Sequence, residues 1–224
     1  LFFFVCQAYA WGIADGVTTN PSLLKKAVDK RKKKGQKLNL KTYINEILKV
    51  AKGTPVSLEV TETTAAGMIK QGKALYKMFN KVAKNVYIKI PINPAFKNSD
   101  STHFDGIIAI KALSKAKIPT NCTLIFTPEQ ALLAAKAGAS FVSPFAGRVD
   151  DFLRINAKLK FTKTDHYPVW GETKGKKLLH DNGIVSGIDL VEQCVRVLKH
   201  YNLKTEVLAA SLRNTRQVRE AAMV

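Results

Sequence analysis

The sequence predicts an α/β fold in the form of a (β/α)8 TIM barrel, and three observations predict it. Short apolar strands alternate with helical segments along the chain, which is typical of βαβ units and a parallel sheet. Polar or charged side chains recur near the carboxyl ends of the strands, where barrel enzymes place their active sites. With 224 residues, 46% of them hydrophobic, the chain can bury a full α/β core. We expect one domain over residues 1–224.

The strands are predicted from alternation of apolar and polar residues. Between Asn85 and Pro91 the β-branched or aliphatic residues alternate with Tyr87 and Lys89, a period of two that is typical of a strand. Counted with the opening segment 1–7, the chain has seven candidate strands. The others cover residues 16–21, 55–60, 85–91, 120–126, 140–145 and 206–211.

The segments between the strands are predicted helices. The clearest begins with Pro128 in its first turn and ends at Gly138 after a body rich in Ala and Leu. Two connections are long, and each either covers a site or is a disordered surface insertion. These connections span residues 93–104 and 150–182. The other predicted helices span residues 21–32, 40–52, 64–82, 105–115, 184–201 and 215–223.

Lys89 is the most informative residue of the sequence. It lies between two isoleucines on a predicted strand that ends at Pro91, so its side chain points away from the aliphatic face. Burial lowers the pKa of a lysine and frees its lone pair, which favours a desolvated amine nucleophile at Lys89. The alternative is an ordinary lysine on an edge strand.

Other polar residues repeat this placement on the remaining strands or follow shortly after them. Each of them alone could be a turn residue at the end of a strand, but together they predict a barrel mouth lined by catalytic groups. The residues in question are Asn20, Glu59, Asn121, Thr123, Ser143, Arg148, Ser211 and Arg213.

These motifs resemble the transaldolase family, specifically its small single-domain branch. The resemblance runs from about Ile13 to the end of the chain, and its motifs are specific when taken together in this order. They are Asp15-Gly-Val-Thr-Thr-Asn-Pro-Ser-Leu23, Val56-Ser-Leu-Glu-Val60, Ile88-Lys-Ile-Pro91, Asn121-Cys-Thr-Leu-Ile-Phe126, Val142-Ser-Pro-Phe-Ala-Gly-Arg148 and Ala210-Ser-Leu-Arg213.

The resemblance implies a class I aldolase barrel in the non-oxidative pentose phosphate pathway. Such an enzyme moves a dihydroxyacetone unit from a ketose phosphate (sedoheptulose 7-phosphate or fructose 6-phosphate) to an aldose phosphate through a lysine Schiff base. It implies sugar phosphate substrates, no metal or organic cofactor, and a homo-oligomer of five or ten copies.

Carried over by motif, the resemblance gives Lys89 the role of the Schiff-base lysine. It assigns the catalytic water to Glu59 and Thr123, substrate hydroxyls to Asn20, Asn121 and Ser143, and the phosphate to Arg148, Ser211 and Arg213. Asn121 is also expected to orient Lys89.

The fructose 6-phosphate aldolase branch is the nearest alternative. It typically carries Gln at the position of Glu59, Tyr at the position of Phe145, and a Gly-Thr-Ala run where this chain has Asn121-Cys-Thr123. All three residue choices favour a transaldolase.

Two departures from the family pattern predict an incomplete barrel. The opening segment 1–7 lacks the Leu-Asp-Thr end of the family's first strand, and Asp15 does not replace that acid. The first helix is shortened to a remnant around residues 8–12, and the eighth strand and C-terminal helix are absent before the end at Val224. We therefore expect Schiff-base formation to survive and C–C cleavage to be impaired.

The charge leaves a second class of function open. The chain has 36 Lys and Arg against 17 Asp and Glu, a net charge of +19, densest between Lys25 and Lys34. A basic protein of this kind could be a barrel fragment that binds nucleic acid. No aromatic residues interleave the cluster and no nucleic-acid motif occurs, so nucleic acid is not the expected partner.

The cysteines and hydropathy predict a cytoplasmic protein. The three cysteines form no CxxC pair and no Cys/His metal spacing, which favours free thiols in a reducing compartment. No apolar stretch approaches the ~20 residues of a membrane span.

Overall fold

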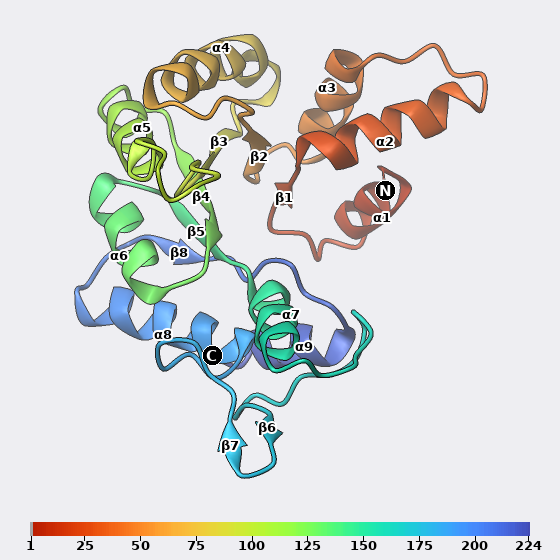
Figure 1. The fold of residues 1–224 in the computed structure, drawn as a ribbon. Helices are drawn as coiled ribbons and strands as arrows, with labels where there is room; N and C mark the ends of the chain where they lie inside the picture. The colour runs from red at the N-terminus through yellow and green to blue at the C-terminus, as the bar shows by residue number, and fades with distance from the viewer. Residues whose placement is uncertain (1) are drawn as a thin grey trace. The chain divides into compact units, whose positions relative to one another are not determined.

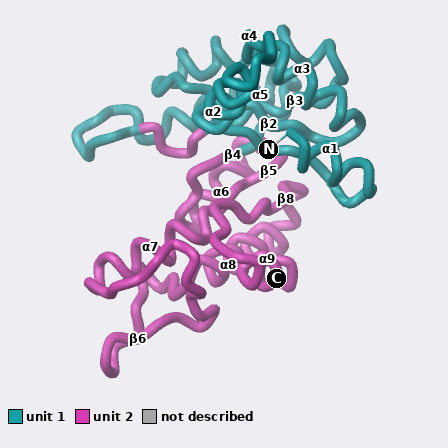
Figure 2. Tube along the Cα trace, turned by 90° about the vertical axis from the view of Figure 1, so that its right-hand side faces the viewer, with its two compact units in different colours: residues 1–90, 95–121 teal, residues 91–94, 122–224 magenta. Residues whose placement is uncertain are grey.

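The computed structural model describes residues 2–224, and Leu1 lies outside the described residues. The chain divides into two compact units, which Figure 2 shows in different colours. The first unit consists of residues 1–90 and 95–121, and the second of residues 91–94 and 122–224.

The first unit is built on three parallel strands (Figure 1). β2 (Val56–Glu59) pairs with β1 (Val17–Thr18) on one side and with β3 (Val86–Pro91) on the other. The helices of this unit are α1 (Phe2–Ala10), α2 (Pro21–Lys32), α3 (Leu40–Val50), α4 (Ala65–Ala83) and α5 (Asp105–Lys115).

Short polar side chains cap three of these helices, α2, α3 and α4. Asn20, Asn39 and Thr64 are N-caps, and each accepts a hydrogen bond from the N–H three residues further on, at 2.8, 2.8 and 3.2 Å. A cap of this type is worth about 1 kcal/mol because it satisfies an N–H that the helix leaves unpaired. Asn20 and Thr64 thus begin the helices that follow β1 and β2.

The strands of the first unit bury their aliphatic side chains toward the helices. Ile88 is fully buried, and α4 approaches it so closely that a Cβ on Gly72 would lie 3.1 Å from its Cγ2 atom. Successive side chains of a strand point to opposite faces. Lys89 therefore lies on the face opposite to Ile88, as the alternation predicts.

The opening segment is a helix, so the prediction of a first strand over residues 1–7 is wrong. α1 covers Phe2–Ala10 and takes in most of the predicted helix remnant. Phe2, Val5 and Tyr9 are half-buried, whereas Phe3 and Phe4 are about two-thirds exposed, a spacing of three to four residues. The helical period was hidden in the sequence because nearly every residue of the segment is apolar.

The second unit carries the parallel strands β5 (Phe141–Pro144) and β8 (Glu206–Val207) and most of β4 (Thr120–Ile125). The N–H of Phe145 donates to the carbonyl of Ile125 at 2.9 Å, next to the end of β4. The helices are α6 (Pro128–Ala137), α7 (Ala146–Asn156), α8 (Gly187–His200) and α9 (Thr215–Ala221). As predicted, Pro128 lies in the first turn of α6, and Gly138 ends that helix at φ 104°.

The long connection of the second unit is more ordered than the sequence suggested. The predicted loop over 150–182 is wrong in its first part, because α7 continues to Asn156. The remainder contains the antiparallel hairpin of β6 (Thr173–Lys174) and β7 (Lys177–Leu178). Buried Arg154 holds this segment in place. The Nε of Arg154 donates to Glu172 Oε2 at 2.6 Å, and its Nη2 donates to the carbonyl of His166 at 2.7 Å.

The α/β class with parallel strands is confirmed, and the described residues contain fewer than the eight parallel strands of a full barrel. Six parallel strands, β1 to β5 and β8, alternate with helices within residues 2–224, each inside a segment predicted as a strand. In the same part of the chain, no helix is both long enough and apolar enough to cross a membrane.

Candidate active site

Lys89 and Glu59 form a pair on the polar face of the first unit. They lie opposite each other in the register of β3 and β2, and Lys89 Nζ is 3.3 Å from Glu59 Oε2. The same amine donates to the carbonyl oxygen of Thr19 at 3.3 Å. The side chain of Lys89 is 11% exposed and that of Glu59 is 19% exposed. The amine is therefore held by a carboxylate and a carbonyl, with little contact with water.

The position of this pair follows from parallel strands. Glu59 is the last residue of β2, and Lys89 lies two residues before the end of β3. The carboxyl ends of parallel strands meet at one edge of a sheet, where barrel enzymes bind substrate. Two residues chosen from strand patterns thus come into contact by register alone.

Asn121 and Asn20 have different surroundings in the first unit. Asn121 is fully buried at the start of β4, and its Nδ2 donates to Ser57 Oγ at 3.1 Å. Ser57 was not among the predicted site residues, although its alternation with Val56 and Leu58 marks it as facing the polar side. Asn20 uses its Oδ1 as the cap of α2, so its Nδ2 is the end that could meet a ligand.

Thr123 and Ser143 belong to the second unit and are both buried. Thr123 lies in β4, and its Oγ1 has no hydrogen-bond partner within residues 2–224. A buried hydroxyl without a partner is costly unless a water or ligand meets it. Ser143 lies in β5 before the turn into α7.

Arg148 and Arg213 line one cavity of about 610 Å³ in the second unit. The Arg148 guanidinium lies 5.2 Å from the centre of the Phe145 ring, which itself packs against Phe126. Two other residues that line the cavity, Lys163 and Asp181, come from the long connection. The two predicted phosphate-binding arginines are thus brought to the same space.

Arg213 is held by Asp151, a residue that was not among the predicted site residues. Its Nη2 is 2.6 Å from Asp151 Oδ2, and its Nε is buried without a partner in the described part of the chain. The segment at Ser211 passes so close to α7 that a Cβ on Gly147 would overlap the Ser211 carbonyl oxygen. Ser211 itself has a positive φ of 61°, which is uncommon for a residue with a side chain. The Asp150-Asp151 pair beside the Gly-Arg motif was the signal that could have revealed this partner.

Asp150 in α7 links this helix to α8 and α9 by hydrogen bonds. Its Oδ1 accepts from the N–H of Gly187 at 2.6 Å, and its Oδ2 accepts from Gln217 Nε2 at 2.7 Å. Burial raises the pKa of this carboxyl to about 6, although both hydrogen bonds act in the opposite direction. Asp150 is therefore a structural acid whose charge is costly to bury.

No three His, Cys, Asp or Glu side chains within residues 2–224 lie where they could hold a metal ion together. The fold and the Lys89–Glu59 pair define an enzyme of the parallel α/β-barrel class. The chain belongs to the transaldolase/fructose-6-phosphate aldolase family, whose model matches residues 4–224.

Curated relatives agree with this assignment over nearly the whole chain. A protein of Aquifex aeolicus named "Probable transaldolase" is 37% identical over 218 residues, which is 97% of this chain and 75% of that protein. Proteins of the same name from Caldicellulosiruptor saccharolyticus and Desulfatibacillum aliphaticivorans are 38% and 39% identical. They cover 96% and 97% of this chain and 75% and 76% of their own lengths.

Proposed function

We propose that this protein is a transaldolase that uses Lys89 as its Schiff-base residue. It transfers a dihydroxyacetone unit from fructose 6-phosphate or sedoheptulose 7-phosphate to an aldose phosphate, as in the non-oxidative pentose phosphate pathway. The observation that carries the proposal is the contact of 3.3 Å between Lys89 Nζ and Glu59 Oε2 on neighbouring parallel strands.

The chemistry begins with proton transfer. Glu59 takes a proton from Lys89, directly or through a water between them, and the neutral amine attacks the C2 carbonyl of the ketose. The carbonyl oxygen leaves as water after protonation, and a C2 iminium remains. This iminium accepts the electron pair of the C3–C4 bond when that bond breaks and the C4 hydroxyl gives its proton to water, so the aldose departs and an enamine stays on Lys89. Attack of the enamine on a second aldose and hydrolysis complete the transfer.

The remaining predicted residues hold the sugar in this scheme. Thr123 supplies a buried hydroxyl for the catalytic water. Asn20, Asn121 and Ser143 bind hydroxyl groups, and Ser211 assists the two arginines. Arg148 and Arg213 bind the phosphate, since guanidinium groups match phosphate geometry and the two share one cavity.

The proposal treats residues 1–224 as one barrel domain of a cytoplasmic homo-oligomer that needs no metal or organic cofactor. The fructose 6-phosphate aldolase reaction is the alternative within the same family. Phe145 disfavours it, because its ring packs between Phe126 and the Arg148 guanidinium and has no hydroxyl to donate a proton.

Trapping with borohydride tests the proposal directly. Incubation with fructose 6-phosphate and borohydride should attach one reduced sugar fragment, and peptide mapping should place it on Lys89. Trapping requires only Schiff-base formation, so it also works if C–C cleavage is slow.

Two variants make the trapping decisive. Lys89→Met keeps the aliphatic stem and should lose the label, whereas Lys70→Ala, at an exposed position of α4, should keep it. Circular dichroism checks that both variants are folded. A label that persists in Lys89→Met, or that spreads over surface lysines, refutes the assignment.

A further inference from the structure

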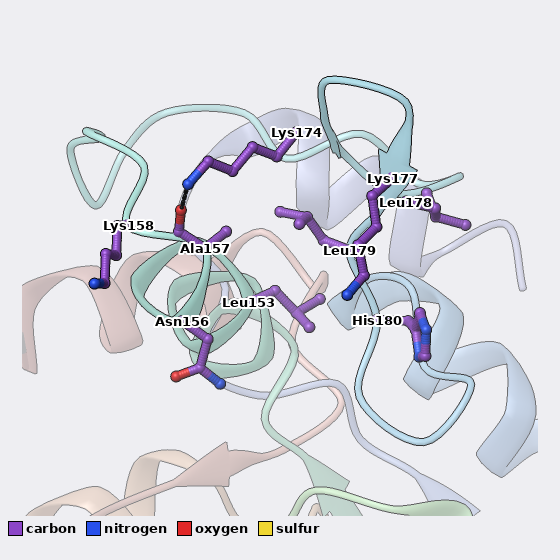
Figure 3. A pocket seen from close by; sticks show the side chains of 9 residues that line it. All are labelled: Leu153, Asn156, Ala157, Lys158, Lys174, Lys177, Leu178, Leu179 and His180. Atoms are coloured by element: carbon purple, nitrogen blue, oxygen red, sulfur yellow. Dashed lines mark hydrogen bonds between the residues drawn. The ribbon is translucent and has the colours of Figure 1, made fainter.

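A second cavity of the second unit lies between the end of α7 and the β6–β7 hairpin, and its volume is about 520 Å³ (Figure 3). Three lysines line it, together with Asn156 and His180, and none of its lining residues is acidic. The lysines are Lys158, Lys174 and Lys177. None of these residues belongs to the proposed transaldolase site.

Local backbone geometry builds the two walls. Lys158 ends α7 in a left-handed conformation with φ 55°, and the N–H of Leu159 returns to the carbonyl of Arg154 at 3.0 Å. The hairpin turns at Gly175, which has φ 62° and follows Lys174 directly. The end of α7 and the turn of the hairpin thus form the two walls.

The hairpin places two lysine residues directly opposite each other in its backbone register. Lys174 pairs with Lys177 in the antiparallel register. Like charges at such a position destabilise a hairpin unless something neutralises them. Glu172, two residues before Lys174, is already paired with Arg154 at 2.6 Å, and Asp181, four residues after Lys177, lines the arginine-lined cavity and not this one. The pair of lysines therefore has no carboxylate among the lining residues and fits an external anion.

The two lysines present their amines differently. Lys174 Nζ donates to the Ala157 carbonyl at 2.8 Å and so covers the negative end of the α7 dipole (Figure 3). The amine of Lys177 points into the cavity, on the side where the ring of His180 lies. Leu153 and Leu179 add an apolar wall.

We propose that this cavity binds an organic phosphate. The phosphate groups lie against Lys177, Lys174 and His180, and the organic part lies against Leu153 and Leu179. The volume is within the range of about 300–1,000 Å³ that is usual for small-molecule sites. Charge-assisted contacts to lysine favour phosphate, and the leucines favour a ligand with an apolar portion over an inorganic ion.

Isothermal titration with ATP and with tripolyphosphate tests both parts of the proposal. The two probes carry the same number of phosphates, but only ATP has an organic part for the leucine wall. We expect ATP to bind more tightly than tripolyphosphate. Failure of ATP to bind, or equal or tighter binding of tripolyphosphate, overturns the proposal.

Neighbouring lysines provide the matched control. Lys177→Ala should weaken ATP binding by about tenfold or more, as expected for one lost charge-assisted contact. Lys176→Ala removes the same charge from the exposed turn of the hairpin, outside the cavity lining, and should have little effect. Equal losses of ATP affinity in the two variants would show that only the net charge of the protein matters, and would overturn the proposed site.

A third variant separates this site from the arginine-lined cavity. ATP binding should persist in Arg213→Ala, because Arg213 does not line the cavity of the lysines. Loss of ATP binding there would assign it to the proposed substrate site and refute the second cavity. The result is independent of whether Lys89 forms a Schiff base.

Discussion

The Lys89–Glu59 pair and the arginine-lined cavity are positioned in different ways. The first depends on strand register: two residues opposite each other on β3 and β2 face the same side and meet at 3.3 Å. The second depends on side-chain partners, since Arg213 is held by Asp151 and Arg148 lies on the ring of Phe145. Register is a property of the backbone and tolerates substitution of neighbours, whereas a cavity held by side chains should be sensitive to each of them.

The largest effect is expected at Glu59. Glu59→Gln keeps the size of the side chain but removes the base, so the rate of borohydride trapping should fall by roughly 10²–10⁴-fold. Glu62→Gln, at an exposed position three residues later, is the control and should trap at the normal rate. Equal rates in the two variants would mean that register brings Glu59 to Lys89 without giving it a catalytic role.

Arg213 tests the side-chain-dependent region. Arg213→Ala should weaken the binding of fructose 6-phosphate by on the order of 2–3 kcal/mol, because a charge-assisted phosphate contact is lost. The measurement is the substrate concentration that gives half-maximal trapping, compared between fructose 6-phosphate and dihydroxyacetone.

Dihydroxyacetone has no phosphate, so the concentration of it that gives half-maximal trapping should hardly change in Arg213→Ala. Arg216→Ala is the matched control, since Arg216 is 58% exposed and bonded to Glu220. Equal losses for both substrates would remove the phosphate role from the cavity and leave the Lys89 proposal intact.

Asp150 should make the second unit sensitive to pH. Its pKa is raised from 3.8 to about 6 in the folded protein, so the folded state keeps a proton that the unfolded chain releases. The protonated carboxyl therefore makes its full contribution to the free energy of unfolding below about pH 4. This contribution falls by on the order of 2–3 kcal/mol as the pH rises through 6.

Denaturant unfolding between pH 4 and 7 measures this effect. Asp150→Asn should remove the fall in the free energy of unfolding over that range, because an amide does not ionise. It should also lower the stability at pH 4, since its Nδ2 cannot accept from Gln217. A pH profile unchanged in Asp150→Asn would contradict the buried charge as its source.

The same contrast explains what the sequence could predict. Alternation located the strands, and parallel pairing then placed Lys89 beside Glu59, because both steps depend on local pattern and backbone register. The helix over residues 2–10 was not predicted because its apolar residues lie on all sides of the helix, so the sequence shows no helical period. Asp151 and Lys163 were missed because α7 was not predicted and its contacts come from a connection without periodic pattern. Arg31 shows the same limit: it lies in the basic cluster, yet it bonds Glu46 at 2.6 Å within the first unit.

The smallest effect is expected in the labelling of the cysteines. Their reactivity compares how tightly each of the two units is packed. Cys6 on α1 is half-buried, whereas Cys122 and Cys194 are buried in the second unit. Burial raises the pKa of Cys122 and raises that of Cys194 to about 12, so neither is a thiolate at neutral pH. A thiol reagent should therefore modify one cysteine quickly in the native protein and all three in denaturant. Mass spectrometry of peptides should place the fast label on Cys6. Fast labelling of Cys194 would show that α8 opens readily, and the side-chain contacts that hold the arginine-lined cavity would then be weaker than the structure indicates.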